Sequence, residues 1–318
     1  MLTRSLKKDD LRLLLVAISK AIPGTNPIKK IDLTPSALDN ATQWAKASCL
    51  LDEQGLTPEG ELMALKDPYL EATVTDWVMH INLGLGDDRS LWSYIVCEFL
   101  SVHSQFTLDN LLEDCHSIFT KQTSEQLKKN IKLILKTYTE KSGILNINFL
   151  EKTKSVYSIG NPQCSNVYTI GYLLAKIWED SFGSRDAVLV TDLLTLKPSL
   201  ATILGVQESE IRVQLDTLAE HQIIEQRSTK PHELGTRASL KSESELDYQV
   251  VRLWKNPVEL LERAYENDRS TPNQPLIKSL EGILDDTDDM LDFSHLLDWT
   301  FGFILIQGGK YSITEIAA

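Results

Sequence analysis

The histidines and cysteines of the chain are too dispersed to indicate a catalytic or metal-binding centre. Histidine stands at positions 80, 103, 116, 221, 232 and 295, and cysteine at positions 49, 97, 115 and 164. No two cysteines have the CxxC spacing that is typical of zinc sites and thioredoxin-like redox sites. Cys115 and His116 are adjacent, but consecutive residues of a helix point about 100° apart and form no nucleophile–base pair by themselves. We therefore expect reduced cysteines, no metal and no other cofactor.

Loops that bind phosphate groups are also missing from the sequence. Neither GxxxxGK[ST] nor GxGxxG occurs. The carboxylates are numerous, but they show no spacing that would indicate paired acid–base catalysis. His80 falls in an apolar helical stretch, which favours a structural histidine. These observations predict a protein that is not an enzyme.

Recognition of nucleic acid is the chemistry that polar residues near the N-terminus favour. A Thr-Pro step predicts the start of a helix that would expose Asn40, Gln43 and Lys46. Amide side chains suit the edge of adenine, and lysine suits phosphate or guanine. Lys29 and Lys30 lie in the connector before this helix. All five side chains are predicted DNA-binding candidates.

A second basic surface is predicted on a helix over residues 124–141. Lys121, Lys128, Lys132 and Lys136 are spaced seven, four and four residues apart, so they share one helical face. Only two glutamates offset them in this stretch. Two interpretations remain open: a surface for phosphate or for an acidic partner, and an ordinary solvated helix face.

Residues 198–228 have the order of a helix-turn-helix followed by a wing. The second of its predicted helices, over residues 208–220, carries four acidic residues and only Arg212 as a basic one. DNA phosphates would repel such a helix, so a protein-binding or architectural role is expected. Candidates for contact with a DNA backbone in the predicted hairpin are Arg227, Lys230 and Arg237.

Helical periodicity dominates the elements that must position these residues. Apolar residues make up 42% of the 318 residues and recur at helical spacing, and no internal repeat is evident. We predict a mainly α protein, helical with two winged-helix-like modules and short β-hairpins. The predicted organisation is an N-terminal winged-helix-like module (1–66), a central helical domain (67–183), a second winged-helix-like module (184–241) and a C-terminal helical segment (242–318).

The charge and hydropathy of the chain restrict its partners. The net charge of −13 argues against a protein that coats nucleic acid non-specifically, because neutralising phosphate requires Lys and Arg. No run of about 18 apolar residues predicts a membrane span, and no signal peptide is recognised. A cytoplasmic location without a membrane partner is expected.

Several segments in order resemble a known bacterial family. They are LTPEGELMALKDPYLEATVTDWVMHINL, SLWSYIVCEFL, LKKNIKLILKTY, YSIGNP and NPVELLERAYE. This series resembles the domain of unknown function 4007 family over roughly residues 10–265. The run from Asp67 to Glu71, with Trp77 and His80, is its most specific part. The GHETF-like segment with which members usually begin does not occur here.

The resemblance implies a function but no catalytic residues. Members of the family are often encoded beside genes for phosphorothioate DNA modification, including a cysteine desulfurase and an adenylyl-sulfate-reductase-like enzyme. The resemblance therefore implies a DNA-associated accessory protein of such a modification and antiphage defence system, with DNA and these enzymes as partners. Two alternatives are an adaptor that holds the enzymes together without DNA contact, and a transcriptional regulator of the same operon.

Overall fold

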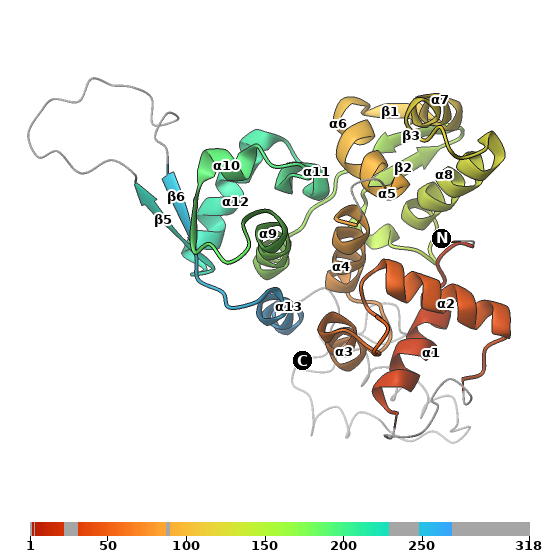
Figure 1. Cartoon of the computed structure of the whole chain (residues 1–318), viewed down its shortest axis with the longest axis horizontal. Helices are drawn as coiled ribbons and strands as arrows, with labels where there is room; N and C mark the ends of the chain where they lie inside the picture. Colours follow the sequence, from red (N-terminus) through yellow and green to blue (C-terminus); the bar gives the residue numbers. More distant parts are fainter. Residues whose placement is uncertain (1, 3, 22–30, 87–89, 229–247, 269–318) are drawn as a thin grey trace, which may run out of the picture. The chain divides into compact units, whose positions relative to one another are not determined.

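Helices form most of the structure, as Figure 1 shows. The computed structural model describes residues 2, 4–21, 31–86, 90–228 and 248–268. The chain divides into two compact units, Met1–Asn267 and Asp268–Ala318. Only Asp268 of the second unit is described, so most of the helical segment predicted over 242–318 lies outside the described residues.

Three helices near the N-terminus pack together: α1 (Lys8–Ser19), α2 (Pro35–Ala47) and α3 (Pro58–Lys66). Thr34 caps α2 by accepting a hydrogen bond from the Ala37 N–H, 3.3 Å away. This cap satisfies one of the N–H groups that the first turn of a helix leaves free. The Thr-Pro step therefore starts a helix where the sequence predicts one.

Between α2 and α3, where a winged-helix-like module over 1–66 would have its wing, the chain forms a single β-bridge between Leu51 and Leu56. The carboxylate of Asp52 accepts hydrogen bonds from the N–H groups of Gln54 and Gly55, and these bonds close the tight turn between Leu51 and Leu56. Among its described residues, the module predicted over 1–66 therefore has no wing of paired strands.

A buried aspartate positions the next helix. The central elements are α4 (Thr73–Gly84), α5 (Leu91–Ser93), the π-helix η2 (Tyr94–Phe99) and α6 (Leu100–Val102). The Asp67 carboxylate accepts hydrogen bonds from the Ala72 N–H (2.9 Å) and from the Thr75 hydroxyl (2.6 Å). A carboxylate at this place satisfies donors at the start of α4 and favours its helix dipole.

A three-stranded antiparallel sheet with two helices follows, which we name the first hairpin module (residues 105–159). Its strand order is β1–β3–β2, and its strands lie beside α7 and α8 (Figure 1). The sequence predicts a helix over residues 124–141, which corresponds to α8, but misses all three strands. The elements are β1 (Gln105–Thr107), α7 (Leu108–Ile118), α8 (Ser124–Thr139), the 3-10 helix η3 (Leu145–Ile147), β2 (Leu150–Thr153) and β3 (Val156–Ile159).

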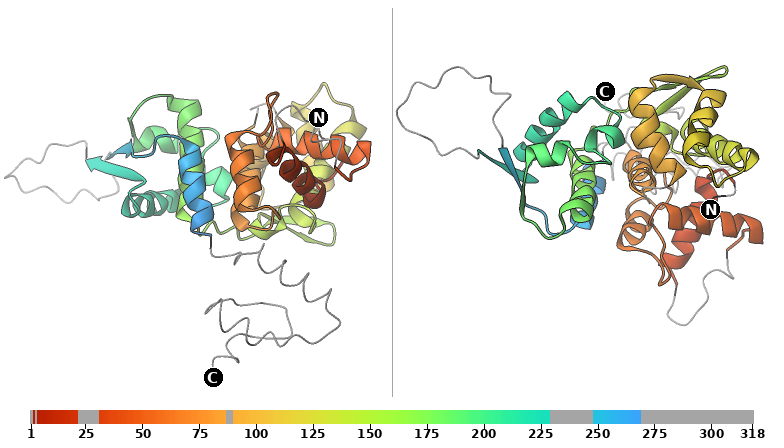
Figure 2. Two further views of the ribbon diagram at one scale, coloured as in Figure 1. Left: turned by 90° about the horizontal axis from the view of Figure 1, so that it is seen from below. Right: turned by 45° about the horizontal axis from the view of Figure 1, so that its top comes forward.

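A second sheet repeats this strand order, β4–β6–β5, in what we name the second hairpin module (residues 187–252). In sequence it stands between α9 (Val167–Phe182) and α13 (Pro257–Glu266), and these two helices pack on each other beside the module (Figures 1 and 2). Its elements are β4 (Ala187–Leu189), α10 (Val190–Leu194), α11 (Leu200–Leu204), α12 (Glu208–Glu220), β5 (Ile224–Ser228) and β6 (Tyr248–Arg252).

The predicted fold class is confirmed: the protein is mainly helical with short β-hairpins. The hairpin after α12 is present, but β6 lies beyond residue 241, so β5 and β6 pair across the predicted boundary. The winged-helix assignment itself stays a prediction. Within the described ranges, no helix combines the length and the apolarity needed to cross a membrane.

Candidate nucleic-acid interface

A capped N-terminus and a stripe of buried apolar residues stabilise and orient the helix α8. The Thr123 hydroxyl accepts a hydrogen bond from the Gln126 N–H, and the Gln126 side chain accepts one from the Thr123 N–H, both at 3.3 Å. Such a reciprocal capping box fixes the first turn. Leu127, Ile131 and Ile134 are buried on the inner face, which leaves the opposite face to solvent.

Lysines occupy that opposite face, as the sequence predicts for residues 128, 132 and 136, whereas Lys121 precedes the start of α8 and does not share its face. Lys132 and Lys136 are exposed, and Lys128 is half-buried. Lys129, which the predicted set omits, is exposed beside them. Lys136 forms an ion pair with Glu140 at 3.3 Å. Within the described ranges, the other three lysines have no ion pair, so their charge is available to an anion.

The hairpin that follows α8 adds two basic residues that sequence reasoning missed. Lys152 is exposed on β2, and its ammonium lies 5.3 Å from the centroid of the Tyr157 ring. A cation at this distance is attracted by the face of the ring. Lys154 is exposed in the turn before β3 and has a left-handed backbone with φ of 57°. The available signal in the sequence was that Lys152 and Lys154 stand two residues apart shortly after the lysines of α8.

The N-terminal candidates do not form the predicted surface. The prediction that Asn40 faces outward is wrong, because its side chain is 4% exposed and donates a hydrogen bond to the Ser5 carbonyl oxygen. Gln43 is half-buried, and its amide donates to the Asp39 carboxylate at 2.8 Å. Lys46 is exposed but pairs with Glu53 at 2.6 Å. The helix α2 therefore offers no array of free amides to a base edge.

The candidates in the second hairpin module are largely neutralised or undescribed. Arg227 is exposed, and its guanidinium binds both oxygens of Glu225, at 2.8 and 2.7 Å. This bidentate pair removes its net charge from the surface. The remaining predicted candidates, Lys29, Lys30, Lys230 and Arg237, lie outside the described residues.

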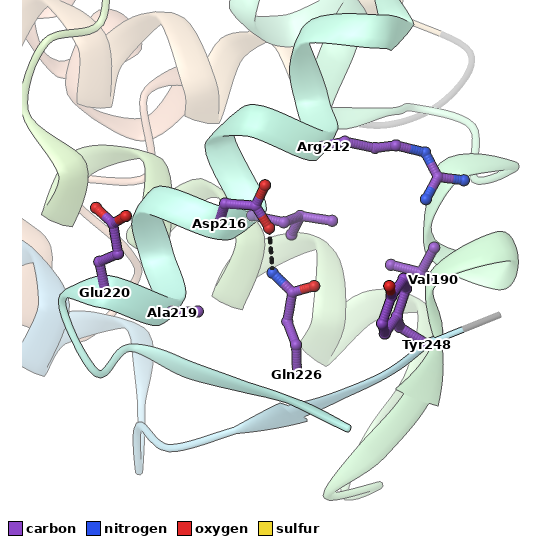
Figure 3. A pocket seen from close by; sticks show the side chains of 8 residues that line it. Val190, Arg212, Asp216, Ala219, Glu220, Gln226 and Tyr248 are labelled. Atoms are coloured by element: carbon purple, nitrogen blue, oxygen red, sulfur yellow. Dashed lines mark hydrogen bonds between the residues drawn. The ribbon is translucent and has the colours of Figure 1, made fainter. Parts of the chain in front are cut away.

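A hollow of about 520 Å³ lies beside α12, between this helix and the strands β5 and β6. Figure 3 shows Asp216 and Arg212 projecting from α12 and Gln226 reaching up from β5. The Gln226 amide donates a hydrogen bond to the Asp216 carboxylate at 2.9 Å. Glu220 adds a second carboxylate to the lining. Two carboxylates against one guanidinium make this hollow unsuitable for a phosphate group.

His80 is a structural residue, as predicted. Its Nε2–H donates to the Ile203 carbonyl oxygen (2.7 Å), so its Nδ1 accepts a hydrogen bond from the Tyr138 hydroxyl (2.8 Å). Tyr138 in turn accepts one from the Trp92 Nε1–H (2.9 Å). Complete burial lowers the pKa of His80 to about 4, although the bond to Ile203 opposes this shift. The neutral imidazole thus joins α8 of the first hairpin module to α11 of the second.

The cysteines and the metal-ligand types show no functional arrangement in the described part of the chain. All four cysteines are free thiols. Cys115 is buried, and burial raises its pKa to about 12, while the neighbouring His116 bonds Ser124 at 2.7 Å. No group of three His, Cys, Asp or Glu side chains within the described ranges is placed to hold a metal ion.

The sequence model of a family described as protein of unknown function (DUF4007) matches residues 41–244. The chain belongs to this family. The match includes the first hairpin module and the second one as far as residue 244, so the lysine face of α8 and the residues of α12 and β5 that line the hollow are parts of the family's region. No curated protein matches the chain.

Two solved structures share the fold. A magnesium ion-bound SspB crystal structure is 16% identical, has a TM-score of 0.60, and the alignment covers 85% of this chain and 88% of that one. A second SspB crystal structure is 15% identical with a TM-score of 0.58, covering 89% and 93%. At this identity the similarity establishes the fold alone.

Proposed function

We propose that this protein is a non-enzymatic, cytoplasmic accessory protein that contacts DNA within a phosphorothioate-type DNA modification and antiphage defence system. The observation that carries the proposal is the exposed lysine face of α8. A chain of net charge −13 repels DNA as a whole, so a local basic face determines the orientation in which DNA can approach. Lys128, Lys132 and Lys136 are the residues that would contact phosphate.

The family supports the biological setting of this proposal. Membership of DUF4007 agrees with the sequence resemblance, and that resemblance implies a place beside phosphorothioate modification genes. The proposed protein partners are a cysteine desulfurase or an adenylyl-sulfate-reductase-like enzyme of that system.

The salt dependence of DNA binding tests the proposal. Each lysine that neutralises a phosphate of B-DNA contributes about 0.9 to the slope of log affinity against log salt concentration. Reversal of Lys128, Lys132 and Lys136 to Glu should therefore lower that slope by about 2 to 3 and weaken binding at 0.1 M salt by about 100-fold or more. Electrophoretic shifts of a 30-base-pair duplex at several salt concentrations measure both quantities.

A matched variant separates this local effect from the effect of total charge. Lys20, Lys197 and Lys255 are exposed lysines outside α8, and their reversal to Glu changes the net charge equally. This control should bind DNA nearly as tightly as the parent. If the parent binds no DNA at low salt, or if both triple variants behave alike, the proposed DNA contact is wrong.

The hollow beside α12 favours a second candidate function, an adaptor for the modification enzymes. Its carboxylates, Asp216 and Glu220, suit a protein segment that carries Lys or Arg. If this is the main function, the purified enzymes should co-elute with the parent in size-exclusion chromatography. Replacement of both carboxylates by Lys should then abolish co-elution and leave DNA binding no weaker.

A further inference from the structure

The helices α8 and α12, each of which precedes the hairpin of its module, have matching caps and matching buried positions at an offset of 84 residues. At the start of α12, the Glu210 side chain accepts a hydrogen bond from the Gln207 N–H, as Gln126 does from Thr123 in α8. The three buried positions of α12 also have buried counterparts on α8, since Ile211, Leu215 and Leu218 match Leu127, Ile131 and Ile134. Because the caps and the inner faces of α8 and α12 match at this offset, Lys132 of α8 corresponds to Asp216 of α12.

The strands of the two sheets correspond as well. In the first hairpin module, Tyr157 of the central strand pairs with Phe106 on one side and with Lys152 on the other. In the second, Val250 pairs with Val188 on one side and with Gln226 on the other. Phe106 and Val188 are each the buried middle residue of a three-residue strand. Lys152 therefore occupies the position of Gln226.

The second hairpin module shows what these two positions do. Its Gln226 reaches Asp216 and donates a hydrogen bond of 2.9 Å (Figure 3). The third residue of the strand that follows the helix, here Gln226 of β5, therefore contacts the outer face of that helix, here α12. In the first hairpin module, the same two positions are both lysines. Two ammonium groups repel each other and cannot bond directly, but they attract a shared anion.

We propose that Lys132 of α8 and Lys152 of β2 together hold one backbone phosphate of duplex DNA. This proposal rests on the proposed DNA contact and adds the hairpin to it. The Tyr157 ring beneath Lys152 orients the lysine stem, so less conformational freedom is lost when phosphate binds. The exposed Lys154 at the turn extends the positive surface along the hairpin.

Transplanting the residues of the second hairpin module tests the phosphate site. The double variant Lys132→Asp with Lys152→Gln should form the carboxylate–amide bond that Asp216 and Gln226 form. Its melting temperature should not fall below that of the parent. Its slope of log DNA affinity against log salt should fall by about 2, and its affinity at 0.1 M salt should fall at least about tenfold.

Two further variants make the outcomes distinguishable. Lys20→Asp with Lys255→Gln changes the net charge equally and should retain the parental slope, and Lys152→Arg should retain it because the positive charge remains. If Lys128→Glu with Lys136→Glu weakens DNA binding while the transplanted variant keeps the parental affinity and slope, the phosphate site is overturned and the proposed function stands. If the parent itself binds no duplex at low salt, the proposed function fails first.

Discussion

The two hairpin modules carry opposite charge on the same arrangement of strands. From the start of α8 to the end of β3, the chain holds seven lysines and three glutamates. The corresponding described residues, 208–228 and 248–252, hold three arginines and five carboxylates. The helices α8 and α12 bury three matching positions, and the two sheets share a strand order. The two modules therefore differ in the charge on the outer faces of α8 and α12 and not in the arrangement of their elements, as expected if each module binds a different kind of partner.

The largest expected effect concerns the side chain that joins the modules. His80→Ala should lower the free energy of unfolding by about 3–5 kcal/mol, because it leaves a cavity and removes partners from the Tyr138 hydroxyl and the Ile203 carbonyl. Denaturant titration measures the loss. The control is His116→Ala, which changes a half-buried histidine outside the core and should cost less than about 1 kcal/mol. Equal stability of His80→Ala and the parent would refute this role.

The second prediction uses pH to separate His80 from a buried carboxylate on the same helix, Asp76. Burial raises the pKa of Asp76 to about 6, although its ion pair with Lys8 opposes the shift. Its contribution to stability is therefore present below about pH 4 and is lost as the pH rises through 6. His80, with its lowered pKa, contributes above about pH 6.5 and loses that contribution as the pH falls through 4.

The two contributions oppose each other between pH 4 and 6.5, so a single substitution should reveal one of them. In Asp76→Asn only the histidine term remains, and stability should decrease steadily as the pH falls. The difference between the parent and variant profiles should change by about 3 kcal/mol over this range. Denaturant titrations at half-unit pH steps measure it. Parallel profiles would contradict the assignment of these pKa shifts.

The third prediction transfers the charge of one hairpin module to the other. Val213, Asp216 and Glu220 occupy the positions on α12 that Lys129, Lys132 and Lys136 occupy on α8. Replacing these three residues of α12 by Lys should raise DNA affinity about 10- to 100-fold at low salt and steepen the salt slope. Gln at the same three positions is the control. Equal affinity of the two variants would show that α8 needs more than charge.

The smallest expected effect is at Lys46, outside both hairpin modules. Lys46→Ala removes an exposed ion pair with Glu53 and should change the free energy of unfolding by at most about 1 kcal/mol. Its DNA affinity should stay within about twofold of the parent, because Lys46 is paired with Glu53 and is the single basic residue of α2, whereas Lys136 lies beside lysines of α8 that form no ion pair with any described residue. A tenfold loss in the electrophoretic assay would return the N-terminal helix to the interface and weaken the contrast between the modules.

Much of the helical framework is predictable from local signals. The helix predicted over residues 208–220 has the bounds of α12, and Thr34 caps α2 where the Thr-Pro step predicts it. The lysine face of α8 follows from spacing alone, because a stripe of buried residues determines which side is exposed. These features depend on residues within a few positions of each other.

The features that were missed depend on distant partners or weak local signals. Asn40 is buried because Ser5, 35 residues earlier, supplies a carbonyl oxygen for its amide. The strands β2 and β3 have four residues each, and their turn contains Lys154 at a positive φ rather than Asn-Gly. The correspondence of the two hairpin modules lies in caps, burial and register, so no repeated sequence indicates it.

The matching register of α8 and α12 also has a consequence for how such a protein can change over generations. The outer positions of these helices do not enter the core, so each substitution there usually alters stability by no more than about 0.5 kcal/mol. A domain of ordinary stability, about 5–15 kcal/mol, tolerates several such steps in succession. A module with this architecture can therefore exchange a nucleic-acid partner for a protein partner through intermediates that all fold. The inner stripes of Leu and Ile stay unchanged throughout.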